Sequence, residues 1–283
     1  PAMTVPHSAS PHCRACGGRD LREILSLGRM PLANALLTSD QLAGPEETFP
    51  LDLVLCPACT LVQITETVPP EKLFREYFYL SSFSETVLEH ARKIAERMIS
   101  ARRLGAVSQV VEIASNDGYL LKNYMKAEVP ALGIEPALNI ARQAEAQGIP
   151  TLGEFFDAPL ALRLANDRKA ADVIHAHNVV AHVADLKGVV KGIGLLLKPD
   201  GVAVIENHYV KDLIDKVEFD SIYHEHLCYY SVTAFERLFS RFGMTMVDAE
   251  RIPIHGGSLR VFFQRADGPQ TWDAGGRARV RRL

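Results

Sequence analysis

Short apolar segments alternate with amphipathic ones through the middle of the chain, from about residue 109 onward. Each apolar segment has the length of a buried strand, and the stretch after it has the apolar period of a helix. The segments are QVVEIA (109–114), ALGIEPA (131–137), ADVIHAHNV (171–179) and GVAVIENH (201–208). Strands and helices that alternate in this way predict a doubly wound, mostly parallel α/β sheet, which binds ligands at the carboxyl ends of its strands.

Amphipathic patterns also flank this region. Within residues 84–104, apolar positions recur three or four residues apart and predict a long helix that Ser84 caps. Its apolar stripe consists of Val87, Leu88, Ala91, Ile94, Ala95 and Met98. Residues 233–243 predict another helix and residues 258–264 a strand. Residues 210–227 are polar and aromatic, and we expect them to form a loop over a site.

The composition limits the classes of function. The 283 residues include 31 Lys and Arg against 34 Asp and Glu, a formal charge of 31 − 34 = −3, and 47% are hydrophobic. This globular composition offers no basic surface that would favour nucleic acid as a partner. No apolar run approaches the ~20 residues of a membrane span, and the first residues lack the order of a signal peptide. We therefore expect a cytoplasmic protein.

Four of the five cysteines form two CxxC pairs, Cys13 with Cys16 and Cys56 with Cys59. A two-residue spacer lets both sulfurs of a pair point at one ion, so the pairs predict a structural zinc site closed by four thiolates. Two disulfides are disfavoured by a reducing compartment, and no βαβ pattern surrounds either pair to support a redox motif. We expect Cys228 to be a buried, inert thiol.

The turn after the first strand of the sheet, VVEIASNDGYLL (110–121), bears on the cofactor. A dinucleotide needs several glycines, but this turn has only Gly118, and Glu112 and Asp117 would repel phosphate. S-adenosylmethionine carries a sulfonium and an ammonium group, which suit an acidic turn. Glu135 is placed to accept two ribose hydroxyls. The turn favours a methyltransferase; a nicotinamide oxidoreductase, and Asp117 as a helix cap, remain alternatives.

Five motifs follow the cysteine pairs in a fixed order: EIASNDGYLL, NVVAHVADL, LLLKPDGVAVIENHY, FDSIYHEHLCYYS and RIPIHGGSLRVF. With this set, the chain up to about Phe263 resembles the zinc-containing, S-adenosylmethionine-dependent sugar C-methyltransferases. That family methylates a ring carbon of nucleotide-linked keto-deoxysugars in antibiotic biosynthesis. The resemblance implies a zinc domain, a domain that binds S-adenosylmethionine, and a C-terminal domain that closes over the sugar nucleotide.

Patterns and resemblance together predict an α/β protein with four regions. Residues 1–72 form a zinc-binding module, 73–105 a bridging helical segment, and 106–240 a doubly wound, Rossmann-like domain that binds S-adenosylmethionine. Residues 241–283 form a short C-terminal region, which we expect to be a truncated form of the family's third domain. The family more often has glycine where Ala114 stands, and the methyl group should crowd the cofactor only modestly.

The segment YHEH (223–226) carries the candidate catalytic groups. It offers a phenol, two imidazoles and a carboxylate within four residues, a density that a core segment would rarely tolerate. The family pattern implies that His226 removes the proton next to a ketone, a task that imidazole suits near neutral pH. Glu225 would orient the base or share its proton, and Tyr223 would hydrogen-bond the carbonyl oxygen as charge develops. We expect His224 to be structural.

Further site residues are assigned by the turn and the resemblance together. The expected cofactor contacts are Glu112, Ser115, Asn116, Asp117, Glu135, Asn178 and Tyr77. The expected substrate contacts are Tyr79, His182, His208 and Arg260. Without the resemblance, Tyr77 and Tyr79 would be interpreted as packing residues. The segment HGGSLR, which contains Arg260, fits a phosphate site and a tight turn equally well.

The leading hypothesis is an S-adenosylmethionine-dependent C-methyltransferase with a structural zinc ion. It would deprotonate the carbon alpha to a ketone of a nucleotide-linked deoxysugar and methylate the enolate. The alternatives are a methyltransferase of the same fold that acts on a non-sugar natural-product intermediate, a non-catalytic remnant that binds S-adenosylmethionine, and a zinc-held interaction module. We expect a monomer or homodimer with a small-molecule substrate, and no nucleic acid or membrane partner.

Overall fold

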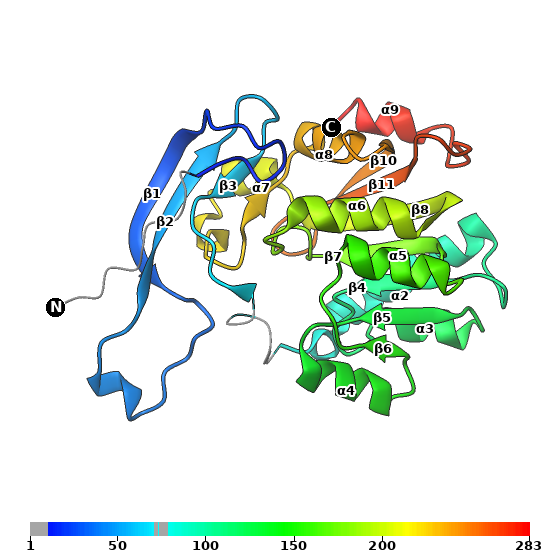
Figure 1. Ribbon diagram of the computed structural model, residues 1–283, viewed down its shortest axis with the longest axis horizontal. Helices are drawn as coiled ribbons and strands as arrows, with labels where there is room; N and C mark the ends of the chain where they lie inside the picture. Colours follow the sequence, from blue (N-terminus) through cyan, green and yellow to red (C-terminus); the bar gives the residue numbers. More distant parts are fainter. Residues whose placement is uncertain (1–10, 71–72, 74–78) are drawn as a thin grey trace.

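The computed structural model describes residues 11–70, 73 and 79–283. Its larger part is a seven-stranded sheet with helices on both faces (Figure 1), in the strand order β10-β11-β8-β7-β4-β5-β6. The strands are β4 (Val110–Ile113), β5 (Ala131–Ile134), β6 (Thr151–Leu152), β7 (Ala171–His177), β8 (Leu197–His208), β10 (Met244–Ile252) and β11 (Ser258–Arg265). The predicted doubly wound α/β fold is confirmed.

The strands of this sheet run mostly parallel. Strands β4 to β8 are parallel to one another, whereas β11 is antiparallel to both β8 and β10. Parallel strands end at one edge of the sheet, so the turns after β4, β5, β7 and β8 come together there. Strands β10 and β11 belong to the same sheet as β4 to β8. The domain boundary predicted after residue 240 therefore divides a single sheet.

Helices α2, α3 and α4 cover one face of the sheet and α5, α6 and α8 the other. They span α2 (Glu85–Arg102), α3 (Leu121–Lys126), α4 (Leu138–Ala146), α5 (Ala158–Asn166), α6 (Leu186–Leu196) and α8 (Val232–Ser240). The predicted long helix is confirmed as α2, and the Ser84 hydroxyl accepts a hydrogen bond from Val87 N, as an N-cap does. Helix α8 ends at Ser240, before the expected Gly243, whose φ of 70° forms the following turn.

A second, antiparallel sheet has the strand order β1-β2-β3-β9; one cysteine pair precedes β1, and the other lies in the turn between β2 and β3. Its strands are β1 (Arg22–Pro31), β2 (Thr48–Leu55), β3 (Val62–Ile64) and β9 (Cys228–Tyr229). Strand β9 comes from the segment directly after YHEH, more than 160 residues along the chain from β3. Figure 1 shows this segment between the two sheets. The zinc-binding module and the larger sheet therefore share their hydrophobic core, and Cys228 is buried in it as expected.

The segment predicted as a loop over a site contains two short helices, α7 (Val210–Asp215) and η3 (Phe219–Ser221). Its Asp212 is fully buried and paired with the Arg251 guanidinium, so part of the segment belongs to the core. Other short helices among the described residues are η1 (Gln41–Ala43), η2 (Ser81–Phe83) and α9 (Gly276–Val280).

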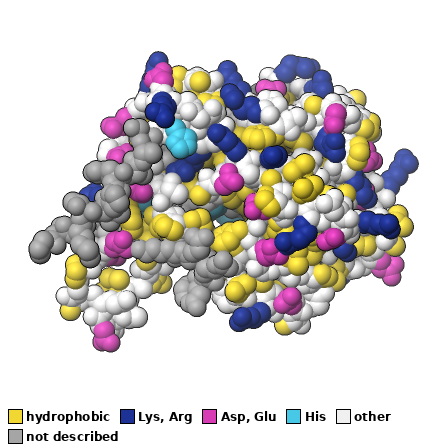
Figure 2. Space-filling model, in the orientation of Figure 1, with side chains coloured by type: hydrophobic (Ala, Val, Ile, Leu, Met, Phe, Trp, Pro, Cys, Tyr) yellow, Lys and Arg dark blue, Asp and Glu magenta, His cyan; other side chains and the backbone are white. Residues whose placement is uncertain are grey.

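On the face shown in Figure 2, basic and acidic side chains are interspersed. None of the helices in the described part of the chain is both long enough and apolar enough to cross a membrane.

Candidate active site

The four paired cysteines converge on one point of the zinc-binding module. Cys13 Sγ lies 3.3 Å from Cys59 Sγ, Cys16 Sγ lies 3.6 Å from Cys56 Sγ, and all four sulfurs are within 4.8 Å of one another. Four thiolates around a tetrahedral zinc at ~2.3 Å would be separated by about 3.8 Å, so the arrangement fits that ion. No disulfide joins any of the five cysteines.

The electrostatics of the cluster also favour a cation. Burial raises the pKa of the Cys56 thiol, and the contact with the Cys13 sulfur raises that of Cys59. Four thiolates side by side, three of them buried, would repel one another in the absence of a positive charge. Zinc would remove that repulsion and hold the N-terminal pair of cysteines against the turn between β2 and β3. Because all four positions are filled by sulfur, the ion would be structural.

The turn after β4 has an unusual backbone for its sequence. Ala114 has a φ of 52° and Asn116 a φ of 49°, so both lie in the left-handed region, as does Gly118 with a φ of 78°. That region costs a non-glycine residue roughly 1–2 kcal/mol. At Gly118 a Cβ atom would come within 2.1 Å of the Ile149 side chain, so only glycine fits there. Strain of this kind at a strand end is typical of ligand sites.

Glu135 organises the turn from the end of the neighbouring strand β5. Its Oε2 accepts a hydrogen bond from Asn116 N at 2.9 Å and its Oε1 one from Ala137 N at 2.8 Å. Each oxygen keeps a second lone pair, so the carboxylate can still accept two ribose hydroxyls. Asn116 Oδ1 also accepts from Ser81 N, and Asn116 Nδ2 donates to Tyr79 O. Residues just before α2 therefore cover the turn.

The other predicted cofactor contacts lie around this turn, with one exception. Asp117 does not cap a helix, because α3 begins at Leu121; its Oδ2 instead accepts from Ser82 N at 3.4 Å. Asn178 follows β7 with a φ of 54°, at the same edge of the sheet. Tyr77 lies outside the described residues. The side chain of Tyr79 is half exposed, and its role in substrate binding stays a prediction.

This edge of the sheet is acidic, and some of its buried oxygens have no partner in the part of the chain that the structure describes. Burial, together with the charges of Glu135 and Asp117, raises the pKa of Glu112, and burial also raises the pKa of Glu135. Several buried acceptors have no hydrogen-bond partner among the described residues: Glu112 Oε2, Ser115 Oγ, Asp117 Oδ1 and Asn178 Oδ1. Buried polar atoms are normally satisfied, so this group indicates a site for a ligand that is positively charged or donates hydrogen bonds.

The proposed base, His226, is held in one tautomer. Its Nδ1 lies 2.8 Å from Ser221 O, and because a carbonyl oxygen only accepts, Nδ1 must carry the proton. In the neutral ring Nε2 is then an acceptor, and the Tyr223 hydroxyl lies 3.1 Å from it. Burial, followed by the neighbouring His182 and His208, lowers the pKa of His226 well below its ordinary value. The ring is therefore neutral, with Nε2 able to take a proton, at neutral pH.

Other histidines surround this ring. His182 and His208 each lie 4.8 Å from His226 between ring centroids, and His255 lies 6.0 Å from His208. Burial lowers the pKa of His182 and of His208 to about 4. His182 and His208 thus lie beside the proposed base, and their contact with the substrate stays a prediction. His255 was not predicted, although it stands next to the glycines of the HGGSLR motif.

Glu225 and His224 both contact the zinc-binding module. Glu225 Oε1 accepts a hydrogen bond from Asn34 Nδ2 at 2.7 Å, and His224 Nε2 lies 3.1 Å from Pro50 O. The His224 contact is that of a structural histidine. Burial raises the pKa of Glu225. Asn34 was not singled out from the sequence, because nothing in its local pattern relates it to a residue so far along the chain.

Arg260 lies in a buried network of charges across the sheet. Its Nε contacts Glu206 Oε2 at 3.0 Å and its Nη1 contacts Glu250 Oε2 at 3.4 Å, while Glu206 Oε1 lies 2.8 Å from His90 Nε2. Only 7% of Arg260 is exposed. Two carboxylates thus already balance the guanidinium, and a contact between Arg260 and the substrate stays a prediction.

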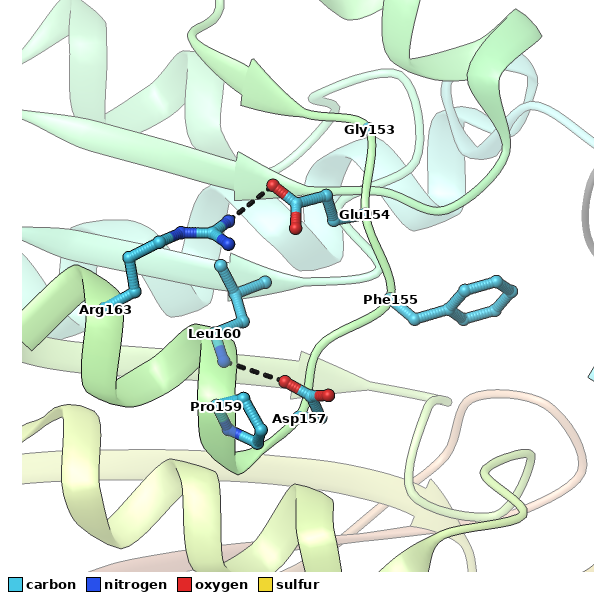
Figure 3. A pocket seen from close by; sticks show the side chains of 7 residues that line it. All are labelled: Gly153, Glu154, Phe155, Asp157, Pro159, Leu160 and Arg163. Atoms are coloured by element: carbon cyan, nitrogen blue, oxygen red, sulfur yellow. Dashed lines mark hydrogen bonds and ion pairs between the residues drawn. The ribbon is translucent and has the colours of Figure 1, made fainter.

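A surface cavity of about 320 Å³ lies beyond β6, at the edge of the sheet. Its lining consists of Gly153, Glu154, Phe155, Asp157, Pro159, Leu160 and Arg163 (Figure 3). Arg163 Nη2 and Glu154 Oε1 form an exposed ion pair across it, and Asp157 caps α5. None of the predicted site residues within the described part of the chain lines this cavity.

The buried histidines predict that acid destabilises the protein. An unfolded histidine binds its proton near pH 6.5, whereas burial lowers the pKa of these histidines in the folded chain. Between about pH 6.5 and 4 the unfolded state therefore binds more protons, and the free energy of unfolding falls by up to ~1.4 kcal/mol per pH unit and histidine. Burial also raises the pKa of three carboxyl groups, and their uptake of protons in the folded state partly offsets this loss of stability. The histidines are His175, His177, His182, His208, His226 and His255, and the carboxyl groups are Glu112, Glu135 and Glu225.

Urea unfolding at pH 7, 6 and 5 measures this effect. We expect the midpoint to fall at each step, since the shifted histidines outnumber the opposing carboxyl groups. A midpoint that stays constant or rises toward pH 5 would show that the imidazoles are not held neutral.

The class of protein follows from comparison with known families. Residues 13–74 match the family described as "Putative zinc binding domain", and residues 84–249 match the family described as "Methyltransferase domain". The second match spans more than half of the chain, which therefore belongs to the methyltransferase family. The matches to a methyltransferase domain and to a zinc-binding domain confirm the predicted cofactors, S-adenosylmethionine and zinc.

One relative narrows the comparison. The chain is 34% identical over 250 residues to the C-methyltransferase NovU of Streptomyces niveus, a match that covers 88% of this chain. It spans 60% of the length of that relative. The resemblance to sugar C-methyltransferases noted from the motifs therefore agrees with a curated C-methyltransferase.

Solved structures share the fold. The PH0226 protein of Pyrococcus horikoshii OT3 aligns with a TM-score of 0.52 at 13% identity, over 70% of this chain and 96% of that one. The magnesium protoporphyrin IX methyltransferase ChlM of Synechocystis PCC 6803, solved with bound SAH, aligns with a TM-score of 0.50 at 10% identity, over 63% of this chain and 83% of that one. At these identities the likeness concerns the fold alone.

Proposed function

We propose that the chain is an S-adenosylmethionine-dependent C-methyltransferase that acts in the cytoplasm on the carbon alpha to a ketone of a nucleotide-linked deoxysugar. The observation that carries this proposal is the state of His226, a neutral imidazole with its Nδ1 proton donated to Ser221 O and its Nε2 left as an acceptor. The NovU relative supports carbon as the atom methylated. The motif resemblance supports the keto-deoxysugar, and free cysteines suit a reducing compartment.

The residues around the β4 turn fit S-adenosylmethionine. Its sulfonium and ammonium charges would lie among Glu112, Asp117 and the unpartnered oxygens of Ser115 and Asn178. A positive charge there favours the ionised carboxylates, whose pKa burial and mutual repulsion otherwise raise. Glu135 would accept the ribose hydroxyls. A pyrophosphate would instead meet three carboxylates and one glycine.

In the proposed reaction, residues of the chain itself transfer a proton and stabilise the negative charge that develops on the substrate. S-adenosylmethionine supplies the methyl group and leaves as S-adenosylhomocysteine. His226 Nε2 takes the proton from the carbon next to the ketone, and the electron pair of that C–H bond forms the enolate. Tyr223, whose hydroxyl lies beside Nε2, donates a hydrogen bond to the enolate oxygen. The enolate carbon then accepts the methyl group, and the His226 imidazolium returns its proton to water.

Cofactor binding tests the proposal. We expect calorimetry to show binding of S-adenosylmethionine and none of NAD, and Glu135→Gln to weaken binding about 10- to 100-fold, because the loss of charge weakens the hydrogen bonds to ribose and to the turn. Glu154→Gln is a matched control, since its carboxylate lies in the exposed pair beyond β6. Binding of NAD alone would contradict the proposed function, and unchanged affinity in Glu135→Gln would contradict the role of that residue.

A further inference from the structure

The zinc-binding module places one of its side chains on the proposed catalytic segment. Asn34 lies in the connection between β1 and β2, and its Nδ2 donates to Glu225 Oε1 at 2.7 Å, across 191 residues of sequence. A carboxylate oxygen accepts, so the assignment of Nδ2 as the donor follows from the chemistry. Neither the sequence motifs nor the comparisons give Asn34 a role.

The same module holds the YHEH segment at two further points. His224 Nε2 contacts Pro50 O at 3.1 Å on β2, and Ile64 N on β3 donates to Leu227 O at 3.1 Å. These two contacts fix the path of the backbone before and after Glu225. The Asn34 contact is different, because it fixes the side chain of Glu225, which is predicted to orient the base or share its proton.

Glu225 depends on this contact. The residue is 4% exposed, and its Oε2 has no hydrogen-bond partner within the described part of the chain. Burial raises the pKa of Glu225, and the hydrogen bond from Asn34 acts in the opposite direction. Its neighbours in the chain, His224 and His226, are ionisable, and His182 hydrogen-bonds the Glu225 backbone. Removing the amide would leave a buried carboxyl group without a donor, and such a group tends to take up a proton.

We propose that Asn34 is a positioning residue, which holds the Glu225 side chain through Oε1 so that the unpartnered Oε2 faces the reaction at His226. This role rests on the proposed function. It makes the zinc-binding module part of the catalytic apparatus, since the connection that carries Asn34 is anchored by the strands β1 and β2.

A double-mutant cycle tests the role, with Asn34→Leu made in the wild-type chain and in Glu225→Gln. The readout is methyl transfer to a nucleotide-linked 4-keto-deoxysugar, with kcat and the KM for S-adenosylmethionine measured separately. We expect Asn34→Leu to lower kcat about 10- to 100-fold, the range for losing a hydrogen bond to a charged group, at unchanged KM for S-adenosylmethionine. In Glu225→Gln the same change should cost less than about threefold, because Asn34 acts through that carboxylate.

A control and a direct measurement accompany the cycle. Gln41→Ala removes a side chain that accepts from Thr38 N in the same connection and does not touch Glu225, so kcat should stay near wild type. In protein labelled with ¹³C at the glutamate carboxyls, Asn34→Leu should raise the titration midpoint of the signal that Glu225→Gln removes.

The possible failures are distinguishable. Equal losses from Asn34→Leu in both backgrounds, or an unmoved Glu225 titration, would overturn the positioning role while the proposed function stands. A wild-type chain that binds S-adenosylmethionine but transfers no methyl group to the keto-deoxysugar would overturn the proposed function and, with it, the catalytic meaning of the contact.

Discussion

Replacing His226 by alanine is expected to lower kcat by about 10²–10⁴-fold, the usual contribution of a positioned acid or base, while the affinity for S-adenosylmethionine stays within about twofold. The proton next to a ketone must be removed before the carbon can attack, and Nε2 of His226 is an acceptor because Nδ1 donates to Ser221 O. Cofactor affinity depends instead on the turn after β4 and on Glu135. Steady-state kinetics with a keto-deoxysugar and calorimetry with S-adenosylmethionine separate the two effects.

The pH dependence of the wild-type rate follows from the same ring. The base acts only when it is unprotonated, and burial lowers the pKa of His226 well below 6.5. The rate should therefore stay constant between about pH 6.5 and 7.5. It should fall only at more acid pH, because the ring is then already protonated and cannot accept a proton from the substrate. A rate that halves near pH 6.5 would mean that the base titrates like an exposed histidine.

Two variants accompany His226→Ala. His226→Gln keeps most of the side-chain volume without a basic nitrogen and should be as inactive, because the reaction needs a proton acceptor rather than a filled space. His12→Ala removes an exposed histidine and should change neither kcat nor cofactor affinity. Turnover near the wild-type rate in His226→Ala would remove the assignment of this residue as the base.

The parts of the molecule that could be predicted are those with a local signal. The long helix α2 was visible from its apolar stripe, and the central strands from short apolar runs that alternate with amphipathic helices. The cysteine pairs converge as their spacing predicts, since two knuckles suffice to define a tetrahedral site. Glu135 contacts the turn after β4 because neighbouring parallel strands end at one edge.

What could not be predicted depends on contacts between distant parts of the chain. Strand β9 has only two residues, and it is a strand only because β3 presents an edge to it. Strand β10 has no clean alternation of buried and exposed residues, because α8 and α9 pack against it and most of its residues are buried. Arg260 is charged and stands beside a glycine turn, but Glu206 and Glu250, on other strands, already balance its charge. Asn34 meets Glu225 across the two sheets.

Removal of the zinc ion is expected to unfold the N-terminal module and to abolish methyl transfer while the larger sheet still binds S-adenosylmethionine. Binding of structural zinc supplies about 10–16 kcal/mol of apparent free energy in small modules at pH 7, which is as large as the ~5–15 kcal/mol net stability of a typical domain. Beyond the cysteines, β1 and the connection after it are largely exposed and provide little core of their own. The module should therefore not stay folded without the ion.

The catalytic loss follows from the contacts that the module makes. Strand β3 pairs with β9, Ile64 N donates to Leu227 O, and Asn34 holds Glu225, so unfolding the module releases the YHEH segment. The cofactor turn, by contrast, is built by β4, β5 and the residues before α2. We expect Cys56→Ser, or treatment with a strong chelator, to reduce turnover at least 100-fold and cofactor affinity only a few-fold. Metal analysis should find one equivalent of zinc in the wild-type protein.

Cys228→Ala is the matched control, because this buried cysteine stands outside the four-sulfur cluster but belongs to the same sheet. It should keep the full equivalent of zinc and most of the activity. Less than one equivalent of metal in protein with all four thiols intact would contradict the zinc site. Full activity in metal-free protein would show that the YHEH segment holds its geometry without the module, which would place its support in the Tyr223, Ser221 and His226 contacts alone.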